Sequence, residues 1–108
     1  MAPGLSEKAW QAQVIDLATL YRWHHFHVFD SRRSAAGWPD LTLVRPPELL
    51  FAELKTDRGR LTRDQRLWIE WLLSCGQEVH VWRPRDFADV HDRLKVRFPL
   101  PVAAGVVV

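Results

Sequence analysis

The sequence predicts a single α/β domain with the element order helix, three strands, helix, strand, helix. Three segments carry apolar residues at helical spacing, and runs rich in aromatic and β-branched residues lie between them. The 108 residues match the size of one domain, and 47% are apolar while 26% are charged, which is typical of a folded globular chain. We therefore expect one domain over residues 1–97 and an apolar tail over residues 98–108.

The first helix is expected over residues 7–20. Ser6 is a residue type that caps helices, and Leu5 and Trp10 stand in the two positions of a hydrophobic staple around it. Apolar residues then recur at helical spacing, namely Trp10, Val14, Leu17, Ala18 and Tyr21. One face of this helix should therefore pack against an apolar surface, which we expect to be a sheet.

Three strands are expected to follow, over residues 22–29, 40–44 and 49–55. The first is rich in aromatic and β-branched residues, and the Ser, Arg, Ala and Gly residues at 30–38 indicate a loop. The two prolines within residues 45–48 cannot easily continue a strand and favour a turn. The second and third strands should therefore form a hairpin.

The rest of the domain is expected to form a helix, a strand and a last helix. Thr62 and Gln65 make a capping-box pair, and Gly76 is placed to end the helix that they begin. Residues 78–82 alternate as a strand does, and Pro84 precedes the last helix. The apolar faces of the two helices are expected to carry Trp68, Ile69, Leu72 and Leu73 in the first and Phe87, Val90 and Leu94 in the second.

The composition bears on the compartment. No apolar run approaches the ~18 residues that suggest a membrane span, and the N-terminus lacks the charged and apolar segments of a secretory signal. Cys75 is the one cysteine, so the chain can form neither an internal disulfide nor a cysteine zinc cluster. We therefore expect a cytoplasmic protein.

The basic residues gather in two stretches, although the formal net charge of +2 is modest. A solvated basic face and a surface that grips DNA phosphates are both consistent with such clusters. The candidates for DNA binding are Arg32 and Arg33 in the first expected loop and Arg58, Arg60 and Arg63 after the third strand.

Asp40, Glu53 and Lys55 are the residues from which we expect chemistry. Side chains alternate across a sheet, so Glu53 and Lys55 should point to the same face. In a hairpin that turns near residues 46–48, Asp40 comes to lie opposite residues 53–55. The two carboxylates and the ammonium group should therefore converge.

Two converging carboxylates raise each other's pKa unless a cation lies between them. Oxygen atoms of Asp40 and Glu53 and the backbone carbonyl of Leu54, completed by water, form the kind of ligand set that Mg²⁺ accepts. A bound Mg²⁺ would polarise a phosphodiester, and Lys55 could orient the attacking water or stabilise developing negative charge. The alternative is a surface strand that carries an ordinary Glu/Lys pair.

Glu7 and Gln65 are further candidates for the same site. Glu7 and Gln11 are one helical turn apart on the expected inward stripe, where Glu7 could hold a second ion or bind metal-bound water. The alternative is a first-turn glutamate favoured by the helix dipole. Gln65 could face the same pocket or serve only in its capping box.

Several short motifs follow one another along the chain, namely Ser6-Glu7 with Gln11, Gly37-Trp38-Pro39-Asp40, Phe51-Ala52-Glu53-Leu54-Lys55, Leu61-Thr62 with Gln65 and Trp68, and Gly76 with Val79-His80-Val81-Trp82. In this order they resemble the VRR-NUC (virus-type replication-repair nuclease) family of the PD-(D/E)xK nuclease superfamily. The resemblance implies a restriction-endonuclease-like core, in which helices flank a central mixed sheet. It implies that Asp40 and Glu53 bind Mg²⁺ or Mn²⁺ and that Lys55 is the catalytic lysine. It also implies that Glu7 is an additional acid and Gln65 an auxiliary polar residue.

The resemblance implies a function as well. The family's single-domain members are similar to phage proteins that act as homodimers on branched DNA. We therefore expect a Mg²⁺-dependent DNA endonuclease that cuts Holliday junctions, other branched DNA or flaps in phage-type DNA replication, recombination or repair. A nicking, exonucleolytic or restriction-type nuclease is one alternative, and a nucleic-acid-binding module without catalytic activity is another.

Overall fold

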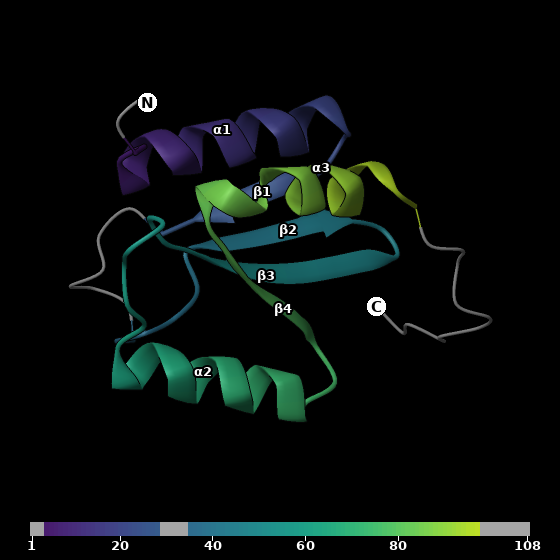
Figure 1. Ribbon diagram of the computed structural model, residues 1–108. Coiled ribbons are helices and arrows are strands. Elements are labelled where there is room, and N and C mark those ends of the chain that lie inside the picture. The colour runs from purple at the N-terminus through teal and green to yellow at the C-terminus, as the bar shows by residue number, and fades with distance from the viewer. Residues whose placement is uncertain (1–3, 29–34, 98–108) are drawn as a thin grey trace.

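The computed structural model describes residues 4–28 and 35–97, so the expected C-terminal tail lies outside the described residues. In the described residues the elements follow the predicted order α-β-β-β-α-β-α, with the short 3-10 helix η2 added before the last helix (Figure 1). They are α1 (Glu7–Leu20), β1 (His24–His27), β2 (Leu41–Arg45), β3 (Glu48–Leu54), α2 (Arg63–Ser74), β4 (Glu78–Trp82), the 3-10 helix η2 (Pro84–Asp86) and α3 (Phe87–Lys95). None of the described helices is both long enough and apolar enough to cross a membrane.

The four strands form one mixed sheet in the order β1-β2-β3-β4. β2 pairs antiparallel with β1 and β3, whereas β4 runs parallel to β3. The predicted hairpin is confirmed, since only Pro46 and Pro47 separate β2 from β3. Helices α1 and α3 cover one face of the sheet and α2 lies against the other (Figure 1). This arrangement is the predicted central mixed sheet flanked by helices.

The hydrophobic core lies between the sheet and the helices α1 and α3. Two buried indoles span this layer: Trp10 Nε1 donates to the carbonyl oxygen of Trp82, and Trp23 Nε1 donates to that of Leu94, each at 3.0 Å. The other buried residues of the cluster are Val14, Ala18, Leu41, Leu43, Leu50, Ala52, Leu54 and Val90. The predicted apolar face of α1 is thus confirmed, and it fixes α1 over the strands that carry the candidate site.

Helix α2 buries less apolar surface than its sequence indicates. No residue of α2 is buried, and Leu73, which we expected on the apolar face, is 51% exposed. The helix is anchored by aromatic contacts instead, because Trp38 packs edge-on against both Phe51 of β3 and Trp68 of α2. A helix that packs on the sheet with no further layer outside it leaves much of its apolar surface in water.

Two further predictions are wrong, one about the apolar face of the last helix and one about the bounds of the first strand. Phe87 is 45% exposed, because it begins α3 at the edge of the core, whereas Val90 and Leu94 are fully buried. The first strand is shorter than the predicted 22–29, because Arg22 turns the chain with a φ of 69° directly after α1.

A chain of ion pairs ties the hairpin end to α3. The guanidinium of Arg45 is buried and donates to Glu48 Oε2 at 2.8 Å and to the carbonyl oxygen of Leu94 at 2.7 Å. Arg93 of α3 lies 3.1 Å from Glu48 Oε1 and also donates to Glu78 Oε2 of β4 at 2.6 Å. These contacts connect β2, β3, β4 and α3 at the end of the sheet opposite the candidate site.

Candidate active site

Asp40 and Glu53 converge at the end of the sheet where β2 begins and β3 ends. Leu41 pairs with Ala52, so the next step of the antiparallel register sets Asp40 beside Glu53, as predicted. Asp40 lies just before β2, and its Oδ2 accepts a hydrogen bond from the amide of Leu54 at 2.8 Å. This bond holds the Asp40 carboxylate against the strand that carries Glu53.

Glu53 is a carboxylate with only 1% of its surface exposed. Burial first, and then the charge and side chain of Asp40, raise the pKa of Glu53 to about 9, with a further small contribution from Glu7 and an opposing one from Lys55. No hydrogen-bond donor of the described residues reaches Glu53 Oε2. A buried acceptor of this kind, beside a second carboxylate, is suited to a cation.

Gln65 combines both roles that the sequence left open. Its Oε1 accepts from the amide of Thr62 at 2.9 Å, while Thr62 Oγ1 accepts from the amide of Gln65 at 3.2 Å, which completes the capping box. Its Nε2 donates to Glu53 Oε1 at 3.1 Å. The capping box therefore orients the side-chain amide that contacts the buried carboxylate.

Lys55 follows β3 directly and is half-buried. Its amide donates to the carbonyl oxygen of Trp82 at 3.1 Å, which continues the pairing with β4 by one residue. A Cβ placed on Gly59 would lie 3.4 Å from Lys55 Cδ, so the loop after β3 packs along the lysine stem. The loop backbone thus limits where the ammonium can go.

Glu7 differs from its prediction. Its side chain is exposed in the first turn of α1 and does not belong to the buried stripe, which begins at Trp10 and continues through Val14. The first turn extends past the core, so water surrounds the carboxylate. Its charge still acts on Glu53, which places Glu7 at the rim of the site.

Arg83 is a residue of this region that the sequence did not single out. Its Nη1 donates to the carbonyl oxygens of Thr56 and Gly59, each at 2.6 Å. These bonds clamp the loop that packs against Lys55. An arginine after a strand gives no sequence signal for such a contact, because the bonded carbonyls lie 24 and 27 residues earlier.

Gly37 is a second residue whose role the sequence did not reveal. Its φ is +89°, and a Cβ there would lie 2.3 Å from the backbone carbon of Asp64 in the first turn of α2. Only glycine allows this approach between the segment that leads to Asp40 and the helix that carries Gln65. The one sequence signal that could have pointed to Gly37 is its place in the Gly-Trp-Pro-Asp run.

The candidate DNA-binding arginines are only partly described. Arg58 and Arg60 lie in the exposed loop between β3 and α2, and Arg63 begins α2, where it is also exposed. All three follow the strand that carries Glu53 within a short stretch of chain. Arg32 and Arg33 lie outside the described residues.

The carboxylates fit a hard cation only with help from other ligands. Among residues 4–28 and 35–97, no group of three or more His, Cys, Asp and Glu side chains is arranged to hold a metal ion. Asp40 and Glu53 supply two oxygen-bearing side chains, and the backbone carbonyl of Leu54 is the third predicted donor. Three protein ligands completed by water suit Mg²⁺, because this ion usually keeps several water ligands.

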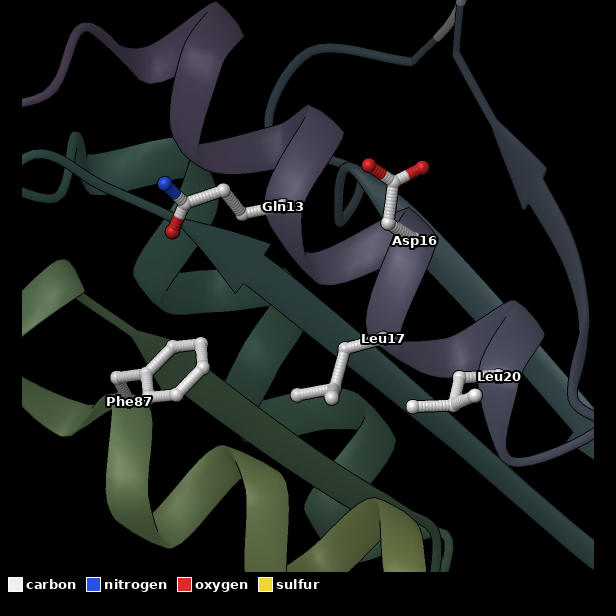
Figure 2. Close-up of a pocket in the computed structure, with 5 residues that line it drawn as sticks. All are labelled: Gln13, Asp16, Leu17, Leu20 and Phe87. Atoms are coloured by element: carbon white, nitrogen blue, oxygen red, sulfur yellow. The ribbon is translucent and has the colours of Figure 1, made fainter.

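A separate shallow cavity of about 410 Å³ lies between α1 and α3. Figure 2 shows Leu17 and Leu20 of α1 on one side of this cavity and Phe87 of α3 on the other. Gln13 and Asp16 complete its lining, so none of the predicted catalytic residues borders it.

Comparisons with known proteins bear on the family and the fold of the chain. The model of the VRR-NUC domain family matches residues 6–86, which is most of the chain. The chain is 39% identical over 54 residues to the Fanconi-associated nuclease 1 homolog of Schizosaccharomyces pombe, and the match covers 48% of this chain but only 8% of that protein. A solved structure described as a VRR_NUC domain protein has the same fold, with a TM-score of 0.65, 24% identity and coverage of 86% of this chain and 88% of its own. The chain belongs to the VRR-NUC family of nucleases.

Proposed function

We propose that the protein is a metal-dependent DNA endonuclease whose active site is formed by Asp40, Glu53 and Lys55. The observation that carries the proposal is the antiparallel register, which sets the Asp40 carboxylate beside the buried Glu53, with Lys55 two residues further along the chain. A pair of adjacent carboxylates, of which Glu53 is fully buried and Asp40 half-buried, is unfavourable for stability alone. Its presence at the end of two strands favours a role in binding a cation and a phosphodiester.

The residues that would hold Mg²⁺, or Mn²⁺ in its place, are Asp40, Glu53 and the backbone carbonyl of Leu54. When bound, the ion supplies Lewis acidity to the scissile phosphodiester and to the attacking water. The amide of Leu54 orients Asp40, and the side-chain amide of Gln65 orients Glu53. Both carboxylates are thus held in place by hydrogen bonds before any ligand arrives.

The remaining side chains act on the DNA. The Lys55 ammonium stabilises the negative charge that develops on the scissile phosphate and orients the attacking water. Glu7, at the rim, accepts hydrogen bonds from water near the carboxylate pair. The exposed guanidinium groups of Arg58, Arg60 and Arg63 contact the phosphate backbone on either side of the cut.

We further propose that the substrate is branched DNA, such as a Holliday junction or a flap, and that the protein cuts it as a homodimer in DNA replication, recombination or repair. The described residues of one chain carry one such carboxylate pair, so two symmetric cuts need two copies. Light scattering after size-exclusion chromatography should give the mass of a dimer.

Cleavage of a four-way junction and a flap should be faster than that of linear duplex or single-stranded DNA. The reverse preference would favour a nicking, exonucleolytic or restriction-type enzyme.

The function is tested by the Asp40→Ala variant. We expect its cleavage rate with Mg²⁺ to fall by roughly 100-fold or more, because the variant loses a metal ligand. Its affinity for DNA, measured with Ca²⁺ by fluorescence anisotropy, should stay close to that of the wild type. Asp16→Ala, an exposed carboxylate change on α1, is the matched control and should cut normally. If the wild type binds DNA but cuts none of the four substrates with Mg²⁺ or Mn²⁺, the protein is a binding module and the proposal is wrong.

A further inference from the structure

A second cavity, of about 320 Å³, lies between the first half of α1 and the end of β1. Its size falls in the range of small-molecule sites, which runs from about 300 to 1,000 Å³. The residues that line it are Lys8, Gln11, Ala12, Ile15, His27 and Val28. None of them belongs to the proposed catalytic set.

One backbone hydrogen bond links the lining of this cavity to Asp40. The amide of Val28 donates to the backbone carbonyl oxygen of Asp40 at 3.3 Å, so one wall of the cavity is held against the backbone of the residue whose carboxylate is proposed to bind the metal. On the opposite wall, Gln11 lies one helical turn after Glu7, whose charge acts on Glu53. The cavity therefore lies next to the segment that leads into β2 and next to the helical turn that follows Glu7.

The lining matches the chemistry of a nucleotide. Ala12, Ile15 and Val28 offer an apolar surface suited to the faces of a base. The half-buried Gln11 carries both a donor and an acceptor, which suit the polar edge of a base. Lys8 is exposed at the mouth, where its charge can meet a phosphate.

His27 adds a planar wall to the same cavity. Its ring stacks on that of His25, with the centroids 6.0 Å apart and the planes 18° from parallel. The end of β1 thus places a stacked imidazole pair at the border of the cavity.

We propose that this cavity binds the nucleotide next to the scissile phosphate, with its base against Gln11 and the apolar wall and its phosphate at Lys8. The assignment of the bound nucleotide as a neighbour of the cut rests on the proposed nuclease function. A nucleotide seated here is taken out of the regular base stack, which costs less where strands branch or end. The cavity thereby gives a physical reason for a preference for branched DNA.

Binding is tested without cleavage, by titrating a 5′-phosphorylated thymidine dinucleotide into isotope-labelled protein in EDTA. The amide resonances of Ala12, Ile15 and Val28 should shift in a saturable way. Gln11→Leu should weaken the affinity by roughly three- to tenfold, because it removes the hydrogen bonds of one amide. Gln13→Leu, on the same helix but lining the cavity of Figure 2, should leave the affinity unchanged. Shifts confined to other residues, or equal affinities for both variants, would overturn the proposal.

Cleavage then separates this proposal from the proposed function. Once the cut has been mapped, an abasic residue beside it should lower kcat/KM of the wild type by roughly three- to tenfold, and by less in Gln11→Leu. Lys8→Met, a change at an exposed position, should raise KM, whereas Lys95→Met at the end of α3 should not. Normal cleavage by Gln11→Leu and Lys8→Met would refute the nucleotide site and leave the nuclease intact. If the protein binds the dinucleotide but cuts no DNA, the nucleotide site stands and the proposed nuclease function is refuted.

Discussion

At the scale of a single residue, Glu53 lowers the stability of the fold. The carboxylate is 1% exposed, its Oε2 meets no donor of the described residues, and Asp40 lies beside it. Burying an ionisable group in this way disfavours the charged form and weakens the folded state. Strands at this position would be more stable with a neutral residue, so the glutamate is best explained by function.

The Glu53→Gln variant tests this conflict. In EDTA we expect its free energy of unfolding to rise by about 1–3 kcal/mol, because the new amide can donate to Asp40 and no buried carboxylate remains unsatisfied. DNA cleavage with Mg²⁺ should fall by roughly 100-fold, since a proposed metal ligand is lost. Urea denaturation and a cleavage assay measure the two effects. A variant that is less stable than the wild type would show that Glu53 stabilises the fold.

Elements hold the site through a few contacts between distant segments. Gly37 brings the segment before β2 against the first turn of α2, and Arg83 clamps the loop after β3. Both contacts act on backbone, so they fix the positions from which Asp40, Lys55 and Gln65 project. Without them each side chain would stay on its element but the elements could shift relative to one another.

Gly37→Ala should be strongly destabilising. The left-handed φ costs an L-residue about 1–2 kcal/mol, and the Cβ would overlap the backbone of Asp64, which adds about 1–3 kcal/mol. Gly76→Ala is the matched control, since its φ is +78° and a Cβ there meets nothing within 4 Å. Chemical denaturation should show a larger loss for Gly37→Ala than for Gly76→Ala. Equal losses would mean that the close approach to α2 adds nothing.

Arg83→Met should lower kcat with little change in KM. The loop that packs along Lys55 would lose two hydrogen bonds, and small misplacements of a catalytic group reduce rates by roughly tenfold or more. Arg83→Lys retains a donor and should restore part of the activity. Arg85→Met removes only an exposed contact of 3.4 Å to Asp57 and serves as the control. An unchanged kcat in Arg83→Met would show that Lys55 needs no support from the loop.

At the scale of the whole molecule, the proposed active site and the ion-pair network lie at opposite ends of the sheet. The core between the sheet and α1 and α3 joins them, while α2 contributes little buried surface. At the network end, Glu78 of β4 accepts from Arg93 at 2.6 and 2.9 Å and contacts His80 at 2.6 Å. These bonds fasten α3 to β4, the strand that pairs with β3.

The stability of the protein should depend on Glu78 in acid. Burial alone would raise the pKa of Glu78, but hydrogen bonds and charges from Arg93 and His80 outweigh it and lower the pKa below 4.5. Such a group stabilises the fold fully above pH 4.5, and its contribution is lost as the pH falls through the lowered pKa. Glu78→Gln should therefore reduce stability by about 1 kcal/mol at pH 7 and by less at pH 3. Thermal melts across this range, with the exposed Glu70→Gln as control, measure the difference, and a loss independent of pH would contradict the linkage.

The sequence by itself determined the order of the elements and the pairing at the site. The spacing of apolar residues, the capping residues and the two prolines are local signals. For this reason α1, α2 and β4 have almost the predicted bounds. The hairpin register follows from the same signals, because a turn at Pro46 and Pro47 leaves little freedom for which residue meets Glu53. The convergence of Asp40 and Glu53 was therefore predictable.

Only the tertiary structure decided what surrounds these residues. The exposure of Glu7 and Phe87, the double role of Gln65, and the contacts of Gly37 and Arg83 depend on segments that are far apart in the chain. Periodicity tells which face of an element is apolar, but it does not tell where the neighbouring element ends. Burial and long-range hydrogen bonds are set by that neighbour, which is why they appear only when the helices pack on the sheet.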